Sequence, residues 1–402
     1  MSRKFIIGLT VFCLSPTVMA ADCNHTIKSP REALVCILEN HPNLKALRIR
    51  GSELSAREDV AKQFPNPELD ATSKLAGEKK VEIDLLQPIE LGGKREARLQ
   101  IARAENLTLK LQDEEKHFAV LLEAIQQIAR YRQLRSELAI ANESIASVRN
   151  IISRLRRRPN LPPDQANSLR LFTLLLNTLE FKVLALEREE REATKSIELG
   201  LGRSIQKGDD IGLAAPTKWP ELKVPDSHAS LVVRMALAEK SLAEAQSTAA
   251  QSEIWPDVRI GPSFEREIES EKNSIGVAFG VTIPIWNSNR PARELAQARL
   301  AFSSRLSDAA RTGSARQFEL TVHAYKTSTT LLAQSETLES ISRSLRNSER
   351  VFSRGLIPPP SMIEMYRSSM DLIEEIHKNE LVAFTAWSTL HLSTDLNSME
   401  LP

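Results

Sequence analysis

Two stretches of this chain follow the same pattern, and that internal repeat limits the possible fold more than any other feature of the sequence. They are residues 64–98 and residues 255–293. Each opens with an aromatic residue followed by proline, continues through two runs in which apolar and polar residues alternate, and ends in a basic step that leads into a long helical pattern. Alternation with a period of two is typical of strands with one apolar and one polar face. The chain is therefore predicted to be a tandem repeat of one structural unit.

The long segments that follow each strand pair predict helical hairpins. From Lys94 to about Arg157 there is neither proline nor glycine, and apolar residues recur at spacings of three and four. Proline-rich breaks at 158–164 and 355–360 separate each outgoing helix from a returning helix with the same pattern. Two antiparallel helices with matching apolar seams form a coiled-coil hairpin. In the second hairpin the outgoing helix is expected to run unbroken from Pro291 to Arg354, with Gly313 as its weakest point.

Each repeat is thus expected to hold a short helix, a strand pair and a hairpin, so the predicted fold class is mainly α with a small β part. The short helix of the first repeat, residues 29–63, contains Pro42 and is expected to kink or break there. The expected bounds are residues 21–226 for the first repeat, with strands at about 66–75 and 80–88, a hairpin at 94–199 and a linker at 200–226, and residues 227–402 for the second repeat, with strands at about 257–266 and 274–285 and a hairpin at 291–394.

Residues 1–20 are predicted to be a secretory signal sequence. Arg3 and Lys4 precede an apolar run, and the segment ends at the small residue Ala20. The apolar run is too short to cross a bilayer as a helix, so we expect export by a bacterial route rather than anchoring at this point. The charges of the whole chain are balanced, with 53 Lys and Arg against 52 Asp and Glu, and nucleic acid is not an expected partner.

The chain has three cysteines, of which Cys13 lies in the predicted signal sequence. Cys23 and Cys36 remain, and an oxidising compartment favours their pairing in a disulfide. The alternative is two unpaired thiols, with Cys36 buried on a helix. A lipid anchor on Cys23 is disfavoured because Asp22 stands where a lipidation signal has a small residue.

Each chain is predicted to have only four strands with alternating apolar and polar residues, and the number matters if they form a membrane barrel. Strands of about 8–11 residues are long enough to cross a bilayer when tilted. In lipid every backbone polar group must find a partner, so only a closed barrel is allowed, and four strands are too few to close one. Several chains would then pool their strands, and the polar faces, with Glu82, Asp84 and Arg259, would line water. The alternative is a soluble, half-buried sheet.

No catalytic motif is recognisable, and neither an enzyme nor a cofactor is expected. His117, His323 and His377 lie on predicted long helices and are interpreted as solvated or seam-edge side chains rather than metal ligands. The methionines at 362, 365 and 370 could ligate a soft metal, but helical core packing is the favoured interpretation.

Residues 64–69 (FPNPEL) and 87–95 (QPIELGGKR) resemble the TolC family of outer-membrane efflux channels, most of all the branch that serves cation exporters of the cobalt-zinc-cadmium type. The resemblance covers nearly all of the chain after the signal sequence. It implies a homotrimer with a shared twelve-stranded barrel in the outer-membrane lipid, a long periplasmic α-helical barrel, and an equatorial belt formed in part by residues 200–227. It also implies docking on a periplasmic adaptor (a membrane fusion protein) and an inner-membrane RND-type pump, with heavy-metal cations as the cargo.

The hairpin turns are the expected entrance and docking site of such a channel. Arg354 and Gly355, followed by Glu364, resemble the second turn of the family, but Ser361 replaces the first of the two acidic residues that family members often have there. The first turn is unusually basic, with Arg154, Arg156, Arg157 and Arg158. These arginines are either solvated helix ends or part of an adaptor contact or gate. We expect pairing of arginines with Asp164 or Glu364 to hold the resting entrance shut.

Two other functions remain open at this stage. One is a drug or type I protein secretion channel of the same family. The other is a periplasmic coiled-coil adaptor or scaffold, which is disfavoured because an adaptor usually has one hairpin per chain.

Overall fold

The computed structural model describes residues 23, 25–74, 79–157, 162–222, 225–283, 285 and 288–392, so the predicted signal sequence lies outside the described residues. Its elements, in chain order, are α1 (Pro30–Asn40), α2 (Pro42–Leu47), α3 (Arg50–Lys62), β1 (Glu68–Lys74), β2 (Lys80–Ile89), α4 (Lys94–Arg156), α5 (Pro163–Leu201), the 3-10 helix η1 (Ser227–Ala229), α6 (Leu231–Ser252), β3 (Val258–Glu267), β4 (Asn273–Val281), α7 (Arg290–Gln334), α8 (Leu338–Ser353) and α9 (Pro359–Leu392). The predicted fold class is confirmed: long helices and a small antiparallel sheet.

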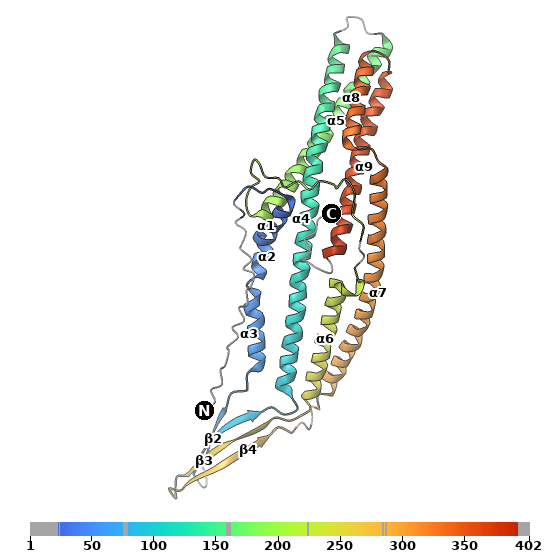
Figure 1. Ribbon diagram of the computed structural model, residues 1–402. Coiled ribbons are helices and arrows are strands. Elements are labelled where there is room, and N and C mark those ends of the chain that lie inside the picture. The colour runs from blue at the N-terminus through green and yellow to red at the C-terminus, as the bar shows by residue number, and fades with distance from the viewer. Residues whose placement is uncertain are drawn as a thin grey trace, which may run out of the picture.

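The molecule is elongated, with the sheet at one end and both hairpin turns at the other (Figure 1). Helix α4 runs the whole way between them; its 63 residues correspond to about 95 Å. Helix α5 returns only to mid-height, and the half nearer the sheet is completed by α3 and α6. Helices α7 and α8 climb from the sheet to the tip, and α9 descends to mid-height. None of the described helices is long and apolar enough to cross a membrane.

The sheet joins the two repeats, because its strand order is β1-β2-β3-β4 and every neighbouring pair is antiparallel. The register aligns apolar residues across the strands: Ile83 lies opposite Phe264, which lies opposite Ile275. This apolar face is uncovered, with Ile275 86% and Phe279 67% exposed. β4 ends at Val281, earlier than expected from the sequence, and residue 284 is a proline that has no N–H to donate to a strand partner.

A glycine pair forms the turn from the sheet into the helices. Gly92 and Gly93 both adopt left-handed backbone conformations, with φ of 71° and 76°. A Cβ on Gly92 would come within 2.3 Å of the Trp255 side chain, so only glycine lets the two repeats approach here. The glycine pair thus forms a tight turn between β2 and α4.

The break expected at Pro42 is present, and a second break that was not expected lies near Ile49, so residues 29–63 form three helices. The expectation of one unbroken outgoing helix in the second hairpin was wrong. The outgoing helix of the second hairpin does not reach Arg354 unbroken, and it passes through Gly313 without interruption. It breaks instead at Ser335, which is extended, and restarts where Thr337 accepts a hydrogen bond from the Ser340 N–H at 3.2 Å. A threonine in this position is a strong helix start, and it outweighs the weak cost of one glycine.

A mid-height core anchors the N-terminal segment and the linker between the repeats. Cys23 and Cys36 are joined by a disulfide, with 5.7 Å between their Cα atoms, and both are buried in this core. The side chain of Asp209 in the linker is fully buried; it pairs with Arg203 at 2.8 Å and accepts a hydrogen bond from the Ile27 N–H at 2.9 Å. Burial alone would raise the pKa of Asp209, but these partners outweigh it and lower that pKa to about 2. The carboxylate therefore ties the N-terminal segment to the linker.

Candidate functional site

The two hairpin turns meet at the end of the molecule far from the sheet, and a cleft opens between them. This tip cleft has a volume of about 960 Å³ and is lined by α4, α5, α8 and the start of α9. Beneath it lies a buried apolar cluster in which Phe352 packs edge-on against Phe172, with 5.5 Å between the ring centroids. Met362 and Met370 belong to the same buried cluster, which agrees with their interpretation as core residues. The described residues contain no group of three His, Cys, Asp or Glu side chains that could hold a metal ion.

The rim of the tip cleft is basic. Its arginines are Arg154, Arg346, Arg350 and Arg354. Only Arg346 has an ion-pair partner in the described part of the chain, Glu143 at 3.2 Å. The rim carries two carboxylates, Asp164 and Glu349, so four cations face two anions.

One of these carboxylates is already engaged. Glu349 accepts a hydrogen bond of 2.7 Å from the hydroxyl of Tyr366, which is fully buried. Burial, and then the neighbouring Glu349 carboxylate, raise the pKa of Tyr366, so the hydroxyl stays protonated and remains a donor. The arginines of the rim therefore keep most of their capacity to bind an external anion.

The structure brings together some of the residues predicted from the sequence and separates others. Arg154, Asp164, Arg354 and Gly355 all line the tip cleft, and Gly355 ends α8 in a left-handed conformation with φ of 79°. Arg156 and Arg157 are exposed beyond it, and Arg158 lies outside the described residues.

Glu364 occupies a different place. It faces a smaller hollow of about 510 Å³ beside α8 and α9, and its carboxylate lies 3.4 Å from the Ser368 hydroxyl. Neither Glu364 nor Asp164 forms an ion pair with an arginine of its own chain among the residues described. A gate held by these carboxylates would need arginines from another chain, and it stays a prediction.

Sequence reasoning missed Arg346 and Arg350. Together with Arg354 they recur every four residues along α8, which places them on one face of the helix. That spacing was the available signal, but nothing in the sequence indicated that this face looks toward the first hairpin.

The polar face of the sheet carries the residues expected to line water. Glu82 and Asp84 share this face with Arg259, because the β2–β3 register sets them opposite Glu265, Ser263 and Pro88 respectively. Arg259 pairs with Glu68 at 3.2 Å across the sheet. No ion pair is formed by Glu82 or Asp84 with the residues that the structure describes.

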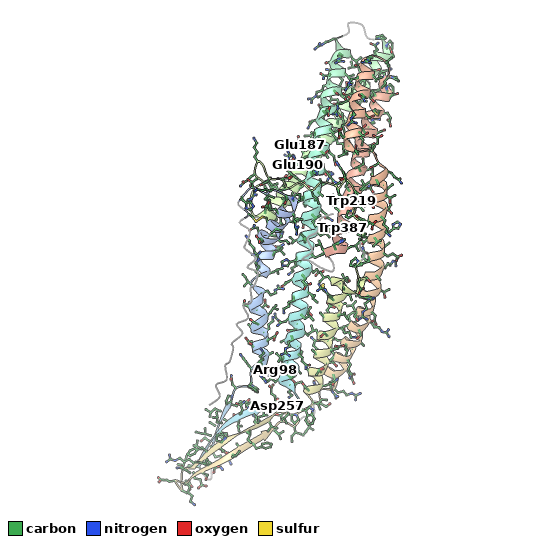
Figure 2. All side chains as sticks on the ribbon, viewed as in Figure 1. Arg98, Glu187, Glu190, Trp219, Asp257 and Trp387 are labelled. Atoms are coloured by element: carbon green, nitrogen blue, oxygen red, sulfur yellow. A yellow bond between two sulfur atoms is a disulfide. The ribbon has the colours of Figure 1, made fainter. Side chains whose placement is uncertain are left out.

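The junction between sheet and helices is held by charges. Lys94, at the start of α4, is buried and lies 2.8 Å from Asp257 and 3.5 Å from Glu253. One turn later Arg98 binds Glu90, with 2.9 Å between Nη2 and Oε2. Figure 2 shows Arg98 and Asp257 at this junction. Because Lys94 belongs to the first repeat and its partners to the second, the pair fixes the direction in which the helices leave the sheet.

A second buried charge network crosses the hairpins nearer mid-height. Glu137 on α4 accepts a hydrogen bond of 2.7 Å from Arg130 and makes a 2.7 Å contact with Nδ1 of His377 on α9. Arg130 also reaches Glu189 on α5 at 2.7 Å. The interpretation of His377 as a solvated or seam-edge side chain was wrong, since only 2% of its side chain is exposed. The network links three helices of both repeats.

An aromatic cluster fixes the linker on the other side of the molecule. Trp219 packs edge-on against Tyr325, with 6.2 Å between the ring centroids, and Tyr325 lies 5.9 Å from Trp387. Figure 2 shows Trp219 and Trp387 together at mid-height. The linker thus runs between the disulfide core and this cluster, around the middle of the molecule (Figure 1).

No protein-family profile matches the sequence. No curated protein matches it either. Several solved structures, however, are similar to this one. The open state of the MtrE outer membrane channel of Neisseria gonorrhoeae superposes with a TM-score of 0.74 at 14% identity, over 90% of this chain and 88% of that one.

Two further channels agree with this result. The CmeC outer membrane channel of Campylobacter jejuni gives a TM-score of 0.68 at 11% identity, over 92% of this chain and 88% of its own. The outer membrane protein VceC of Vibrio cholerae gives a TM-score of 0.67 at 13% identity, over 90% of this chain and 95% of its own. The protein therefore has the fold of TolC-like outer-membrane channels along nearly its whole length.

Proposed function

We propose that this protein is the exit channel of a tripartite efflux system in a bacterial outer membrane. The observation that carries the proposal is the sheet, whose apolar face is exposed and whose edge strands β1 and β4 have unpaired backbone groups on their outer sides. Such edges need partners in lipid. Pairing β1 of one copy with β4 of the next closes the sheet, and three copies supply twelve strands.

The helices offer matching surfaces for the same assembly. On α7, Leu295, Phe302 and Leu306 form an exposed apolar stripe near the sheet. At the same height a groove of about 640 Å³ lies between α3 and α4, lined in part by Val60 and Ile101. A stripe and a groove on different surfaces of one chain generate a head-to-tail ring. A homotrimer would cover both.

The first test concerns assembly. The protein is expected in the outer-membrane fraction, and in mild detergent its mass should be three times that of the chain that remains after removal of residues 1–20. Light scattering coupled to size exclusion measures the mass, and planar bilayers measure conductance. A monomer, or recovery from the soluble periplasm, would overturn the proposal.

For the cargo we propose heavy-metal cations, delivered by a periplasmic adaptor and an RND-type pump that dock at the tip. The register supports this choice, because carboxylates outnumber basic groups on the polar face of the sheet. The carboxylates there are Glu68, Asp70, Glu82, Asp84, Glu265 and Glu267, against Lys74, Lys80 and Arg259. A water-filled passage with this excess attracts cations.

The second test concerns this cargo. Deleting the gene is expected to lower tolerance to cobalt, zinc or cadmium salts, measured as growth inhibition and as metal retained by the cells. Restoring the wild-type gene is the control. If metal tolerance is unchanged while drug resistance or secretion of a protein is lost, the channel serves one of those cargoes instead.

A further inference from the structure

The exposed apolar surface of the sheet continues past the ends of the strands toward the helices. Phe64, which precedes β1, is 70% exposed, and Trp255, which precedes β3, is 58% exposed. Gln87 lies on the same face of β2 as Ile83 and donates a hydrogen bond of 3.0 Å to the Pro65 carbonyl, which places Pro65 beside the apolar face. Exposed aromatic side chains at the edge of a membrane-facing apolar surface are typical of the headgroup level of a bilayer.

An arginine is stacked on the first of these aromatic rings. The guanidinium carbon of Arg95 lies 4.3 Å from the centroid of the Phe64 ring, and its Nε donates a hydrogen bond of 2.7 Å to the Lys62 carbonyl. Arg95 is exposed and forms no ion pair with the residues that the structure describes. The stack and the Nε hydrogen bond hold the planar group in one place, so its two terminal nitrogens can bind an acceptor from outside the chain.

Arg95 occupies a position where an unbalanced cation is unfavourable. It lies in the first turn of α4, and the dipole of a helix favours anions at this end. The adjacent Lys94 is neutralised by Asp257 at 2.8 Å. In the second repeat, Arg290 at the matching position is paired with Glu294 at 2.8 Å. The charge of Arg95 therefore favours an anion that this chain does not itself supply among its described residues.

We infer that Arg95, stacked on Phe64, binds the phosphate group of a phospholipid in the periplasmic leaflet of the outer membrane. This inference rests on the proposed function, in which the sheet lies in that membrane. A guanidinium group binds a phosphate with two parallel hydrogen bonds, and the aromatic ring beneath it lies against the apolar part of the same lipid. Because no carboxylate balances this cation, a lipid with a net negative charge, such as phosphatidylglycerol, is bound in preference to zwitterionic phosphatidylcholine.

Trp255 provides a fluorescent reporter near this site, because its side chain packs against Gly92, three residues before Arg95. The protein is reconstituted in phosphatidylcholine vesicles that contain a small fraction of either brominated phosphatidylglycerol or brominated phosphatidylcholine. Bromine quenches tryptophan on contact, and the difference between wild type and Trp255→Phe isolates the Trp255 signal. Brominated phosphatidylglycerol is expected to associate about fivefold more strongly than the brominated phosphatidylcholine.

Two outcomes with the wild-type protein would overturn the inference. One is equal quenching of Trp255 by the two brominated lipids, or no quenching by either. The other is loss of the preference when sodium phosphate is added to the vesicles, which would show that Arg95 binds free phosphate rather than a lipid headgroup.

Variants on α4 separate this contact from general surface charge. Arg95→Gln should abolish the preference for phosphatidylglycerol, and Arg95→Lys should keep part of it, because a lysine retains the charge but not the paired hydrogen bonds. Arg103→Gln is the control: this arginine lies two turns further along α4, is 56% exposed, and should leave the preference as in the wild type.

The trimer mass and the conductance of the same samples decide how a failure is interpreted. An unchanged preference in Arg95→Gln would overturn the inference. Loss of the trimer in that variant would overturn it as well, because Arg95 would then bind a carboxylate of a neighbouring copy. A normal trimer mass and conductance without any lipid preference in the wild type would show that the proposed function stands although the lipid site does not.

Discussion

Replacing Ile83 by arginine is expected to prevent the protein from accumulating in the outer membrane, whereas the same replacement of its neighbour Glu82 is expected to be tolerated. Adjacent residues of a strand point to opposite faces. Ile83 lies on the exposed apolar face, opposite Ala71 and Phe264, and Glu82 lies on the polar face, opposite Thr72 and Glu265. An arginine facing the middle of a bilayer costs about 2–4 kcal/mol, and a trimer would bear that cost three times.

The measurement compares membrane fractions and trimer mass for the two variants, expressed at equal levels. The pair is closely matched, since the same residue is introduced at neighbouring positions of β2 and both backbone pairings are kept. Equal yields of membrane-inserted trimer from both variants would show that the apolar face of the sheet is not in contact with lipid. Loss of both would indicate that β2 tolerates no arginine at all, and Ile83→Asn would then have to separate the two faces.

The second large effect is expected at Glu137. Glu137→Ala removes the shared partner of Arg130 and His377 and leaves their polar groups in a site where the His377 side chain is 2% exposed. Removing one member of a buried ionic network costs about 3–5 kcal/mol. Glu189→Ala is the control, because it also removes a partner of Arg130 but is 44% exposed, and its effect should be about 0–1 kcal/mol. Denaturant unfolding of the detergent-solubilised protein, followed by circular dichroism, measures both.

Lowering the pH should weaken the stabilisation that Glu137 provides. Burial alone would raise the pKa of Glu137, but the hydrogen bond from His377 and the charge of Arg130 outweigh it and lower that pKa. A carboxyl group whose pKa is lowered by folding stabilises the protein above its unfolded pKa, and this contribution is lost as the pH falls through the folded value. The Glu137→Ala penalty should therefore be full at pH 7 and shrink as the pH falls below the ordinary pKa of a glutamate, about 4.3. A penalty that is already small at pH 6 would contradict this assignment.

Structural features that depend on residues close together in the sequence could be predicted, whereas features that depend on distant residues could not. The strands were predictable because alternation at Val81–Leu85 and Ile275–Ile283 is written into neighbouring residues. The hairpins were predictable because apolar residues recur at spacings of three and four over long stretches that proline-rich turns separate. The break at Ser335 was local too, but it required weighing a helix start at Thr337 against a single glycine.

The candidate site was harder to predict because its parts are distant in the sequence. Glu137 and His377 are 240 positions apart. The residues around each of them in the sequence are those of a solvent-exposed helix face, so neither position indicated a buried contact. Arg154 and Arg350 line the same tip cleft from different helices. The sequence around either arginine does not indicate that the other lies nearby. Turns and their charges could be read from the sequence, whereas the direction in which each helix face points depends on packing between the repeats.

The interlocking of the two repeats has a consequence for the order in which the chain can fold. Strand β2 pairs with β3, and α4 packs along α6 and α9, so these surfaces of the first repeat have partners that arrive only with the second. Until the second repeat is available, the first repeat therefore has a bare strand edge and an uncovered helix face, a state prone to aggregation. The Cys23–Cys36 disulfide needs only the first 36 residues, so it can form before the second repeat has folded.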